Sequence, residues 1–367
     1  MSGGHPHTRA ATRGGMCAVA LIVGLFPGAF TQGDTAGGPA GRPPVTRHLP
    51  RHITPEVEQA IGAGLAYLVR TQSRDGAWRN QGSFGRYPIA MTSLAGLALM
   101  MDGNTTTQGR YAPVVDRAAR FLVDACRADG LITRPDEDEG KPMHGHGFAT
   151  LFLAELYGMS EDVDRQRRIH DVLGRAVDLT ARSQSRLGGW YYTPESAGDE
   201  GSVTITQVQG LRACRNAGIA VPKQVIDDAM GYLKLSARSD GGIAYRAQMA
   251  GPSRPAITAA AVCCWFNAGQ YDEPLARRAL RFAKRNIDVR PGSGGHYFYA
   301  HLYLAQALYL SSRQEWDEYF PMMRDHLLRM QKADGSWDGD YVGPVYGTAI
   351  ALVILQLPYN QLPIMQR

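Results

Sequence analysis

Two kinds of hydrophobic segment alternate along the chain. One kind is amphipathic: in residues 315–331, Phe320, Met323 and Leu327 recur at helical spacing among charged residues. The other kind is apolar on nearly every side, which predicts a helix that is buried all round. The amphipathic helices are predicted at 55–73, 114–128, 165–183, 223–236, 275–286 and 315–331, and the apolar helices at 89–101, 147–159, 203–217, 256–268, 299–310 and 346–357.

A glycine-containing turn joins the two helices of each pair. The clearest copies read Gln72-Ser-Arg-Asp-Gly-Ala-Trp78, Gln184-Ser-Arg-Leu-Gly-Gly-Trp190 and Gln331-Lys-Ala-Asp-Gly-Ser-Trp337. With the weaker copies, the turn glycines fall at Gly76, Gly130, Gly189, Gly242, Gly295 and Gly335. A glycine permits a sharp chain reversal that a side chain obstructs. Recurrence at intervals of 40 to 59 residues predicts six helix-pair repeats.

The alternation of half-exposed and buried helices predicts an all-α fold with two concentric layers. We expect an (α/α)6 toroid, in which six outer helices surround six inner helices. An open solenoid also fits the alternation, but its end repeats need polar outer faces. We find no such polar caps around Ile61 or Ile354.

The Gln-x3-Gly-x-Trp turns resemble the QW repeats of the prenyltransferase and squalene-cyclase superfamily. The resemblance extends over about residues 54–360 and implies the toroid fold of that superfamily. It also implies that the repeat Trp and Gln side chains are structural and join one turn to the next helix. We therefore exclude Trp78, Trp190 and Trp337 from the candidate site. A shared fold says little about activity.

The acid motif of the cyclases is missing. The resemblance implies an Asp-x-Asp-Asp-Thr-Ala sequence at the start of an inner helix. At the start of the six predicted inner helices, the position of the motif threonine is occupied by Thr92, Thr150, Thr204, Thr258, His301 and Thr348. A threonine is therefore present in five of six helices, and no aspartate precedes it in any. The acidic run 136–139 is predicted to be a solvated loop, whose carboxyl groups are too weakly acidic to protonate an alkene.

The zinc ligands of the protein prenyltransferases are also missing. Gly347 stands where the resemblance implies a ligand histidine, and the aspartate and cysteine positions fall near Tyr297 and Tyr299. We predict no metal site and no cofactor. His144 and His146 could supply two ligands, but no third is evident, and we interpret them as loop histidines.

The turns that lead into the inner helices are expected at one end of the toroid, because all inner helices run the same way. Helix N-termini at this rim favour anions. Tyrosine-rich concave surfaces suit apolar or glycan-like ligands, although several tyrosines could simply fill a narrow barrel. The candidate rim residues are Arg86, Tyr87, His144, His146, Tyr191, Tyr192, Tyr245, Tyr297, Tyr299, His301 and Tyr346.

Three functions follow as hypotheses. The first is binding of a small apolar, isoprenoid-like or glycan-like ligand, or of a protein, at the rim. The second is a divergent transferase, cyclase or lyase-type enzyme that uses rim His and Tyr side chains, and the third is a structural interaction scaffold. The net charge of +5 includes Arg9 and Arg13 near the N-terminus and is too weak to indicate a nucleic-acid partner.

The N-terminal segment has the pattern of a secretory signal. Arg9 and Arg13 precede an apolar run over residues 16–30, which predicts a secreted or periplasmic protein. No small-x-small cleavage site follows, so an uncleaved N-terminal membrane anchor is the alternative. We divide the chain into a leader (1–30), a Gly/Pro-rich linker (31–50), the toroid (51–360) and a tail (361–367).

Four cysteines lie in the predicted repeats, namely Cys126, Cys214, Cys263 and Cys264. Because they lie in apolar helical patterns without a CxxC motif, we interpret them as small buried hydrophobic residues. A disulfide between Cys214 and Cys263 is the alternative.

Overall fold

The computed structural model describes residues 49–366, except 83–84, 160–161, 196 and 291–295. The predicted leader lies outside the described residues, and so does the predicted linker apart from Leu49 and Pro50. The described part of the chain contains twelve α-helices and no β-strand. None of these helices is long and apolar enough to cross a membrane.

The outer layer consists of the amphipathic helices. They are α1 (Pro55–Thr71), α3 (Ala112–Asp124), α5 (Val163–Arg182), α7 (Lys223–Ser236), α9 (Pro274–Asn286) and α11 (Arg313–Met330). The inner layer consists of the apolar helices α2 (Pro88–Met101), α4 (Pro142–Met159), α6 (Gly201–Asn216), α8 (Pro255–Asn267), α10 (Tyr297–Ser311) and α12 (Pro344–Gln356). Proline at the first or second position begins many of them, because its fixed φ suits the first helical turn. Every predicted helix is present; the largest shift is at α4, which begins at Pro142 instead of residue 147.

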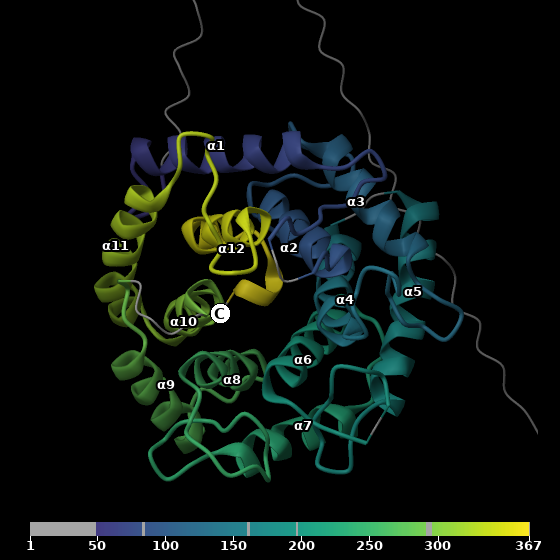
Figure 1. The fold of residues 1–367 in the computed structure, drawn as a ribbon, viewed down its shortest axis with the longest axis vertical. Coiled ribbons are helices and arrows are strands. Elements are labelled where there is room, and N and C mark those ends of the chain that lie inside the picture. Colours follow the sequence, from purple (N-terminus) through teal and green to yellow (C-terminus); the bar gives the residue numbers. More distant parts are fainter. Residues whose placement is uncertain (1–48, 83–84, 160–161, 196, 291–295, 367) are drawn as a thin grey trace, which may run out of the picture. The chain divides into compact units, whose positions relative to one another are not determined.

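The inner helices form a closed circle. Each packs against the next, and α12 packs against α2. Each outer helix covers the inner helix that precedes it in the chain, and α1 covers α12, the last one. Figure 1 shows this arrangement along the axis of the toroid. The predicted all-α toroid with two layers is therefore confirmed, and the open solenoid is excluded.

The repeat Gln and Trp side chains are structural, as the resemblance implied. The buried Trp78 indole donates to the carbonyl of Leu68 over 2.7 Å, within its own repeat. The Gln72 amide donates to the carbonyls of Gly76 and Val114, and Val114 belongs to the next outer helix. Gln184 and Trp190 make the same bonds in the third repeat, and Gln331 and Trp337 make them in the sixth. The Trp side chain thus bonds each turn to the outer helix before it, and the Gln side chain bonds the turn to the next repeat.

Two of the predicted turn glycines are displaced by one residue. The positive φ is found at Gly188 and Gly241, at 89° and 94°, instead of at Gly189 and Gly242. At Gly188 a Cβ would also lie 2.1 Å from the carbonyl oxygen of Asp228 on α7, which no side chain tolerates. The predicted turn glycine Gly295 lies outside the described residues.

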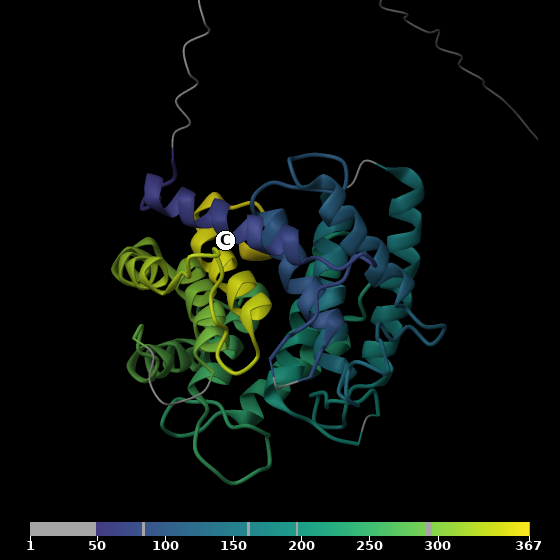
Figure 2. The same cartoon turned by 45° about the horizontal axis from the view of Figure 1, so that its top comes forward.

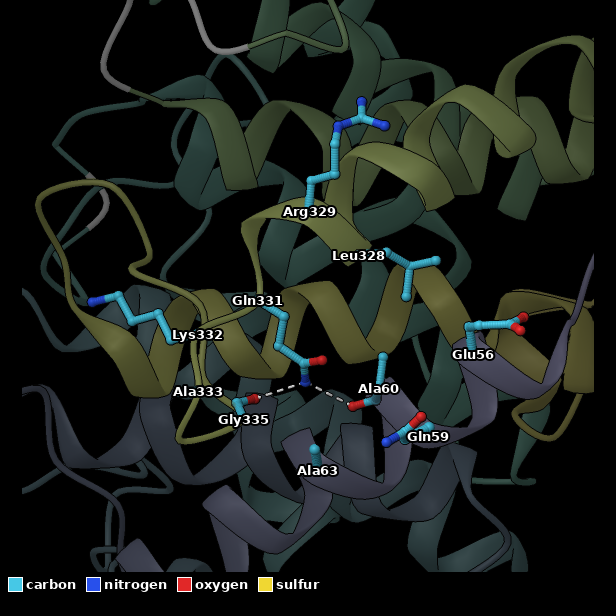
Figure 3. A pocket seen from close by; sticks show the side chains of 10 residues that line it. All are labelled: Glu56, Gln59, Ala60, Ala63, Leu328, Arg329, Gln331, Lys332, Ala333 and Gly335. Atoms are coloured by element: carbon cyan, nitrogen blue, oxygen red, sulfur yellow. Dashed lines mark hydrogen bonds between the residues drawn. The ribbon is translucent and has the colours of Figure 1, made fainter.

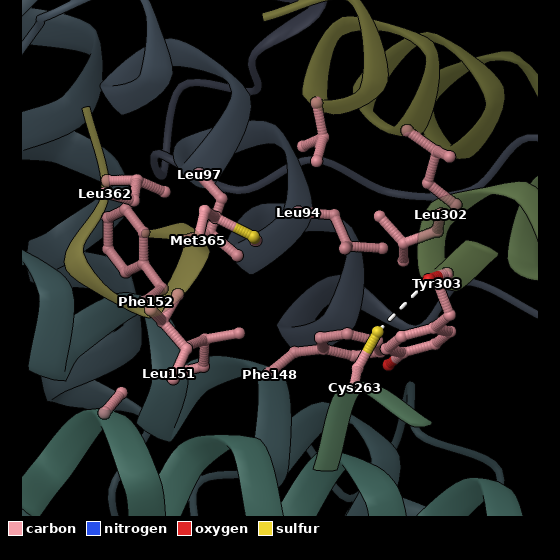
Figure 4. Packing of buried hydrophobic residues seen from close by; sticks show 14 of the residues in the cluster. Leu94, Leu97, Phe148, Leu151, Phe152, Cys263, Leu302, Tyr303, Leu362 and Met365 are labelled. Carbon is pink, nitrogen blue, oxygen red and sulfur yellow. Dashed lines mark hydrogen bonds between the residues drawn. The ribbon is translucent and has the colours of Figure 1, made fainter. Parts of the chain in front are cut away.

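Apolar side chains fill the middle of the toroid. Leu94, Phe148, Leu302 and Tyr303 from three different inner helices are buried there and pack together (Figure 4). The segment predicted as a tail is part of this core: Leu362, Ile364 and Met365 are each less than 5% exposed. The short 3-10 helix η2 (Pro363–Met365) packs against α6 and lies inside the circle of helices in Figure 1.

The cysteines of the described part are free thiols. Cys214, Cys263 and Cys264 are completely buried, which confirms their interpretation as small core residues, and Cys126 is half-buried. The thiol of Cys263 donates to the carbonyl of Tyr303 over 3.1 Å.

Candidate rim site

The loops that lead into the inner helices gather at one end of the toroid, at the bottom of Figure 2. Two of them are fastened to a neighbouring inner helix through their tyrosine residues. The carbonyl of Tyr192 accepts from the amide of Met143 at the start of α4, over 3.1 Å. The carbonyl of Tyr245 accepts from the amide of Gly201 at the start of α6, over 2.9 Å. These bonds fix the tyrosines at the N-terminal ends of α4 and α6.

Three tyrosines of these loops lie together. The rings of Tyr191 and Tyr192 are 4.8 Å apart, and the hydroxyls of Tyr192 and Tyr245 are hydrogen-bonded to each other. All three side chains remain partly exposed. The ring of His144 lies 5.6 Å from the ring of Tyr192. The structure thus brings together four of the predicted rim residues from two adjacent loops and one helix.

A polar chain of three side chains adjoins these tyrosines. The Nε2 atom of His144 lies 2.9 Å from the hydroxyl of Ser202, which itself donates to the carboxylate of Glu200 over 2.6 Å. Because that hydroxyl gives its proton to Glu200, the His144 imidazole is the donor in the first bond. Glu200 also accepts from the amides of Ser202 and Val203 and so caps α6. We call His144, Tyr191, Tyr192, Glu200, Ser202 and Tyr245 the rim cluster.

Burial sets the protonation of the rim cluster. It lowers the pKa of His144, so the imidazole is neutral at pH 7. Burial, together with the negative charge of Glu200, raises the pKa of Tyr192 well above its ordinary value, and burial also raises the pKa of Tyr245. The cluster therefore offers neutral hydroxyls and a neutral imidazole beside one carboxylate.

Tyr299 and Tyr346 extend the site inward. The ring of Tyr299 lies 4.8 Å from that of Tyr303, and burial raises the pKa of Tyr299 well above its ordinary value. Apart from their contact with each other, the buried hydroxyls of Tyr299 and Tyr303 have no hydrogen-bond partner among the described residues. Burial likewise raises the pKa of Tyr346, near Asp340 and Tyr341. Buried polar groups normally have a partner, so these two hydroxyls leave hydrogen-bonding capacity unused at this end of the core.

Glu200 and Ser202 are site residues that were not predicted from the sequence. Glu200 precedes Thr204 by four residues, the spacing of the first aspartate and the threonine in the Asp-x-Asp-Asp-Thr-Ala motif. Ser202 and Val203 occupy the places of the two other acids. A search for the motif that allowed glutamate at its first position would have found this site.

The prediction that His144 and His146 are loop histidines is wrong, because both lie in the first turns of α4. Two residues along a helix are about 200° apart around its axis, so the two imidazoles point to different neighbours. His146 is completely buried and accepts from the amide of Ile132 over 3.2 Å, while its Nε2 atom bonds the hydroxyl of Thr180 in the outer layer. His146 is thus a packing residue and not part of the rim cluster.

The position of His146 is occupied by threonine in most repeats. The hydroxyl of Thr92 accepts from the amide of Trp78, and the hydroxyls of Thr204, Thr258 and Thr348 accept equivalent bonds from their own turns. In the second repeat His146 accepts this bond. Thr150 lies one helical turn further along α4, where it donates to the carbonyl of His146, so it is not equivalent to the threonines of the other repeats. The count of threonines at equivalent positions is therefore four instead of five.

His301 and Tyr297 also pack between the layers. His301 donates from Nε2 to the carbonyl of Asp288 over 3.0 Å and accepts at Nδ1 from the hydroxyl of Tyr319, 2.9 Å away. The ring of Tyr297 lies 4.4 Å from that of His301, tilted by 53°, and the Tyr297 hydroxyl donates to the carbonyl of Val289. These two residues lie beside α11, so the structure does not bring them into the rim cluster.

Arg86 and Tyr87 belong to a separate part of the rim. The Tyr87 hydroxyl donates to Glu139 over 3.3 Å, and Arg86 lies 3.8 Å from Glu137. The prediction of a fully solvated acidic loop is wrong at Asp138, which is only 3% exposed and accepts from the hydroxyl of Thr133. Within the described residues, no group of three His, Cys, Asp or Glu side chains is placed to hold a metal ion.

No family model matches this sequence, and no curated protein sequence matches it. Solved structures do match. A protein from Actinoplanes is 18% identical and covers 83% of this chain and 99% of its own, with a TM-score of 0.57. The type II terpene cyclase MstE from Scytonema is 16% identical, with coverage of 84% and 99% and a TM-score of 0.58. An inactive variant of the α-1,6-mannanase GH76A of Salegentibacter is 7% identical, with coverage of 83% and 99% and a TM-score of 0.60.

At these identities the likeness concerns the fold alone. The chain shares the α/α toroid of these proteins over most of its length. The sequence prediction of this fold class is confirmed by structures that the sequence itself hardly resembles.

Proposed function

We propose that the rim cluster binds a small ligand, with the tyrosine rings as the contact surface and the polar chain as the hydrogen-bonding group. The observation that carries this proposal is the position of three partly exposed tyrosines beside the His144–Ser202–Glu200 chain. Tyrosine rings offer large, rigid faces that stack on apolar or sugar groups. Binding sites typically combine such faces with a few fixed polar groups.

The proposal of a small ligand is supported by what two fold neighbours hold. One structure of MstE contains geranylgeranyl dihydroxybenzoate, and one structure of the mannanase contains α-1,6-mannotriose. The buried hydroxyls of Tyr299 and Tyr303 add a second reason: apart from their contact with each other they have no partner among the described residues, and a ligand with a polar group can supply a further hydrogen bond. The candidate ligands for this chain are therefore an isoprenoid-like compound, as in MstE, and a glycan, as in the mannanase.

The test is to measure binding of geranylgeraniol and of mannotriose by titration calorimetry to the wild type and to Tyr192→Ala. We expect the substitution to weaken binding of whichever probe binds by about tenfold or more, because one stacking face is lost. Tyr157→Ala is the matched control, since Tyr157 contacts His170 at the other end of α4. Equal loss in both variants, or binding that is unaffected by Tyr192→Ala, would contradict the rim location.

A second candidate function is acid–base catalysis at the same place. The observation that favours it is the neutral His144 imidazole hydrogen-bonded through Ser202 to Glu200, a chain along which a proton can move. His144→Gln keeps a hydrogen-bond donor but cannot take up a proton. Turnover of a bound ligand that is lost in His144→Gln, while binding is retained, would establish catalysis; binding without turnover in the wild type would argue against it.

A further inference from the structure

We infer that the ligand of the rim cluster is an acidic glycan, a saccharide that carries carboxylate groups. This inference rests on the proposed function and specifies its ligand. It is drawn from three basic side chains that surround the tyrosines, from the hydrogen-bonding groups beneath them, and from the filled middle of the toroid.

Each tyrosine of the rim cluster has a basic residue over its ring. The ammonium group of Lys141 lies 5.6 Å from the ring centre of Tyr192. The guanidinium of Arg246 lies 4.8 Å from the ring centre of Tyr191, and that of Arg254 lies 5.9 Å from Tyr245. Because the three tyrosines are in contact with each other, these three cations form one positively charged patch.

The three basic side chains of this patch, Lys141, Arg246 and Arg254, are left without ion-pair partners in the described part of the chain, although many other basic side chains have them. The Nε atom of Arg246 is buried and has no hydrogen-bond partner in the described part. An unpaired guanidinium that is partly removed from water favours a carboxylate, which it can bind through two parallel hydrogen bonds.

Helix ends add to the positive potential of the patch. Lys141 immediately precedes α4, and Arg254 is the N-cap residue of α8. Two carboxylates lie nearby: Glu200 is completely buried and already accepts bonds from Ser202 and Val203, and Asp199 accepts from the backbone amide of Ala247, next to Arg246. The outer side of the cluster therefore attracts anions, while its inner side presents groups that hydrogen-bond hydroxyls.

The side chains that fill the middle of the toroid favour a saccharide over a long hydrocarbon chain as the ligand. Leu94, Phe148, Leu302 and Tyr303 occupy the centre, and the C-terminal residues Leu362 and Met365 pack beside Phe152 in the same core (Figure 4). A long isoprenoid would have to displace these side chains. A saccharide needs only the tyrosine faces and hydrogen-bonding groups at the rim, so the geometry favours it.

The experiment compares trigalacturonate with its fully methyl-esterified form, in which each charged carboxylate is replaced by a neutral methyl ester. Binding of each to the full chain is measured by titration calorimetry at low and high salt. We expect trigalacturonate to bind at least about tenfold more tightly than the ester, with an advantage that falls as salt rises. Arg246→Gln should remove most of that advantage. Arg281→Gln is the matched control, because Arg281 is an exposed residue of α9 and its loss changes the net charge equally.

The outcomes separate this inference from the function on which it rests. Equal binding of acid and ester that is weakened by Tyr192→Ala would overturn the inference about charge and leave the rim as a binding site. Binding of geranylgeraniol but of neither saccharide would overturn the saccharide class and again leave the rim as a binding site. Failure of every probe to bind would overturn the proposed function as well. A loss in Arg281→Gln equal to that in Arg246→Gln would show a general effect of charge and contradict the patch.

Discussion

The side-chain amide of Gln331 donates to the backbone carbonyl of Ala60 over 2.8 Å and so joins the last turn of the toroid to its first helix. Gln72 makes the same bond to Val114, between consecutive repeats. The repeat motif therefore closes the circle by the same contact that builds it. Figure 3 shows this junction between α11 and α1, where Gln331 lies in a cavity of about 480 Å³ and also bonds Gly335.

The first prediction concerns the repeat tryptophans. Trp190 is completely buried, and its indole donates to the carbonyl of Thr180. We expect Trp190→Ala to lower the free energy of unfolding by about 3–5 kcal/mol, because it leaves a cavity and an unpaired carbonyl. Chemical denaturation followed by circular dichroism measures this loss. An unchanged denaturation midpoint would show that the indole does not stabilise its repeat.

The second prediction concerns the buried His146. Burial lowers the pKa of His146 to about 4, below its ordinary value of 6.5. The unfolded chain then takes up this proton before the folded chain does, so stability is lost as pH falls from about 6.5 to about 4, by up to about 3 kcal/mol for this residue.

His146→Thr places the residue of most other repeats at this position and should flatten that pH dependence. The comparison uses the free energy of unfolding at pH 7 and at pH 4.5, because the smaller side chain also lowers stability at every pH. His170→Gln serves as control, since His170 is exposed on α5. An unchanged difference between the two pH values in His146→Thr would contradict the prediction.

The third prediction concerns Glu155 in the core. Burial raises the pKa of Glu155 to about 7, although a hydrogen bond from the Ile364 amide opposes the shift. The carboxyl is only 3% exposed, so its stabilising contribution, present below pH 4.5, is lost as pH rises through 7. Glu155→Gln removes the charge, and we expect it to stabilise the protein at pH 8 by about 1–3 kcal/mol and to change little at pH 4.5. Glu318→Gln, on the exposed side of α11, is the control and should not change stability at pH 8. Equal stability of Glu155→Gln and the wild type at pH 8 would contradict the raised pKa of Glu155.

The fourth prediction concerns the chemistry of the superfamily that the repeats resemble. We expect no cyclisation of squalene and no prenylation of a cysteine peptide. Ser202 and Val203 replace the acids of the cyclase motif, and Gly347 stands where a zinc-binding histidine is implied. Loss of even one such electrostatic group costs on the order of a hundredfold in rate. The assays are incubation with squalene, and with a prenyl diphosphate, zinc and an acceptor peptide; turnover that disappears in His144→Gln would contradict us.

The fifth prediction concerns export. We propose that residues 16–30 direct the chain out of the cytoplasm, because an apolar run follows Arg9 and Arg13. Fractionation of cells that express the full chain should place it outside the cytosol. Deletion of residues 16–30 should return it there, and full-length protein found in the cytosol would refute the proposal.

The sequence by itself determined the helices, their layers and the joints between them. Helical periodicity is local, and an apolar segment such as α12 must be buried whatever surrounds it. The Gln and Trp of each Gln-x3-Gly-x-Trp turn make the same hydrogen bonds in each of these turns, so the closed toroid could be predicted from the repeats.

Only the tertiary structure decided which rim residues meet. His144 and His146 are two residues apart in the chain, yet one faces Ser202 at the rim and the other faces Thr180 between the layers. Glu200 occupies the first position of a motif-like sequence, but only the packing of α4 and the two tyrosine loops brings it to Ser202 and His144. The C-terminal residues enter the core because the closed circle of helices leaves an apolar centre that they can fill. Such contacts depend on side-chain direction and on segments far apart in the chain, and a local pattern of residues contains neither.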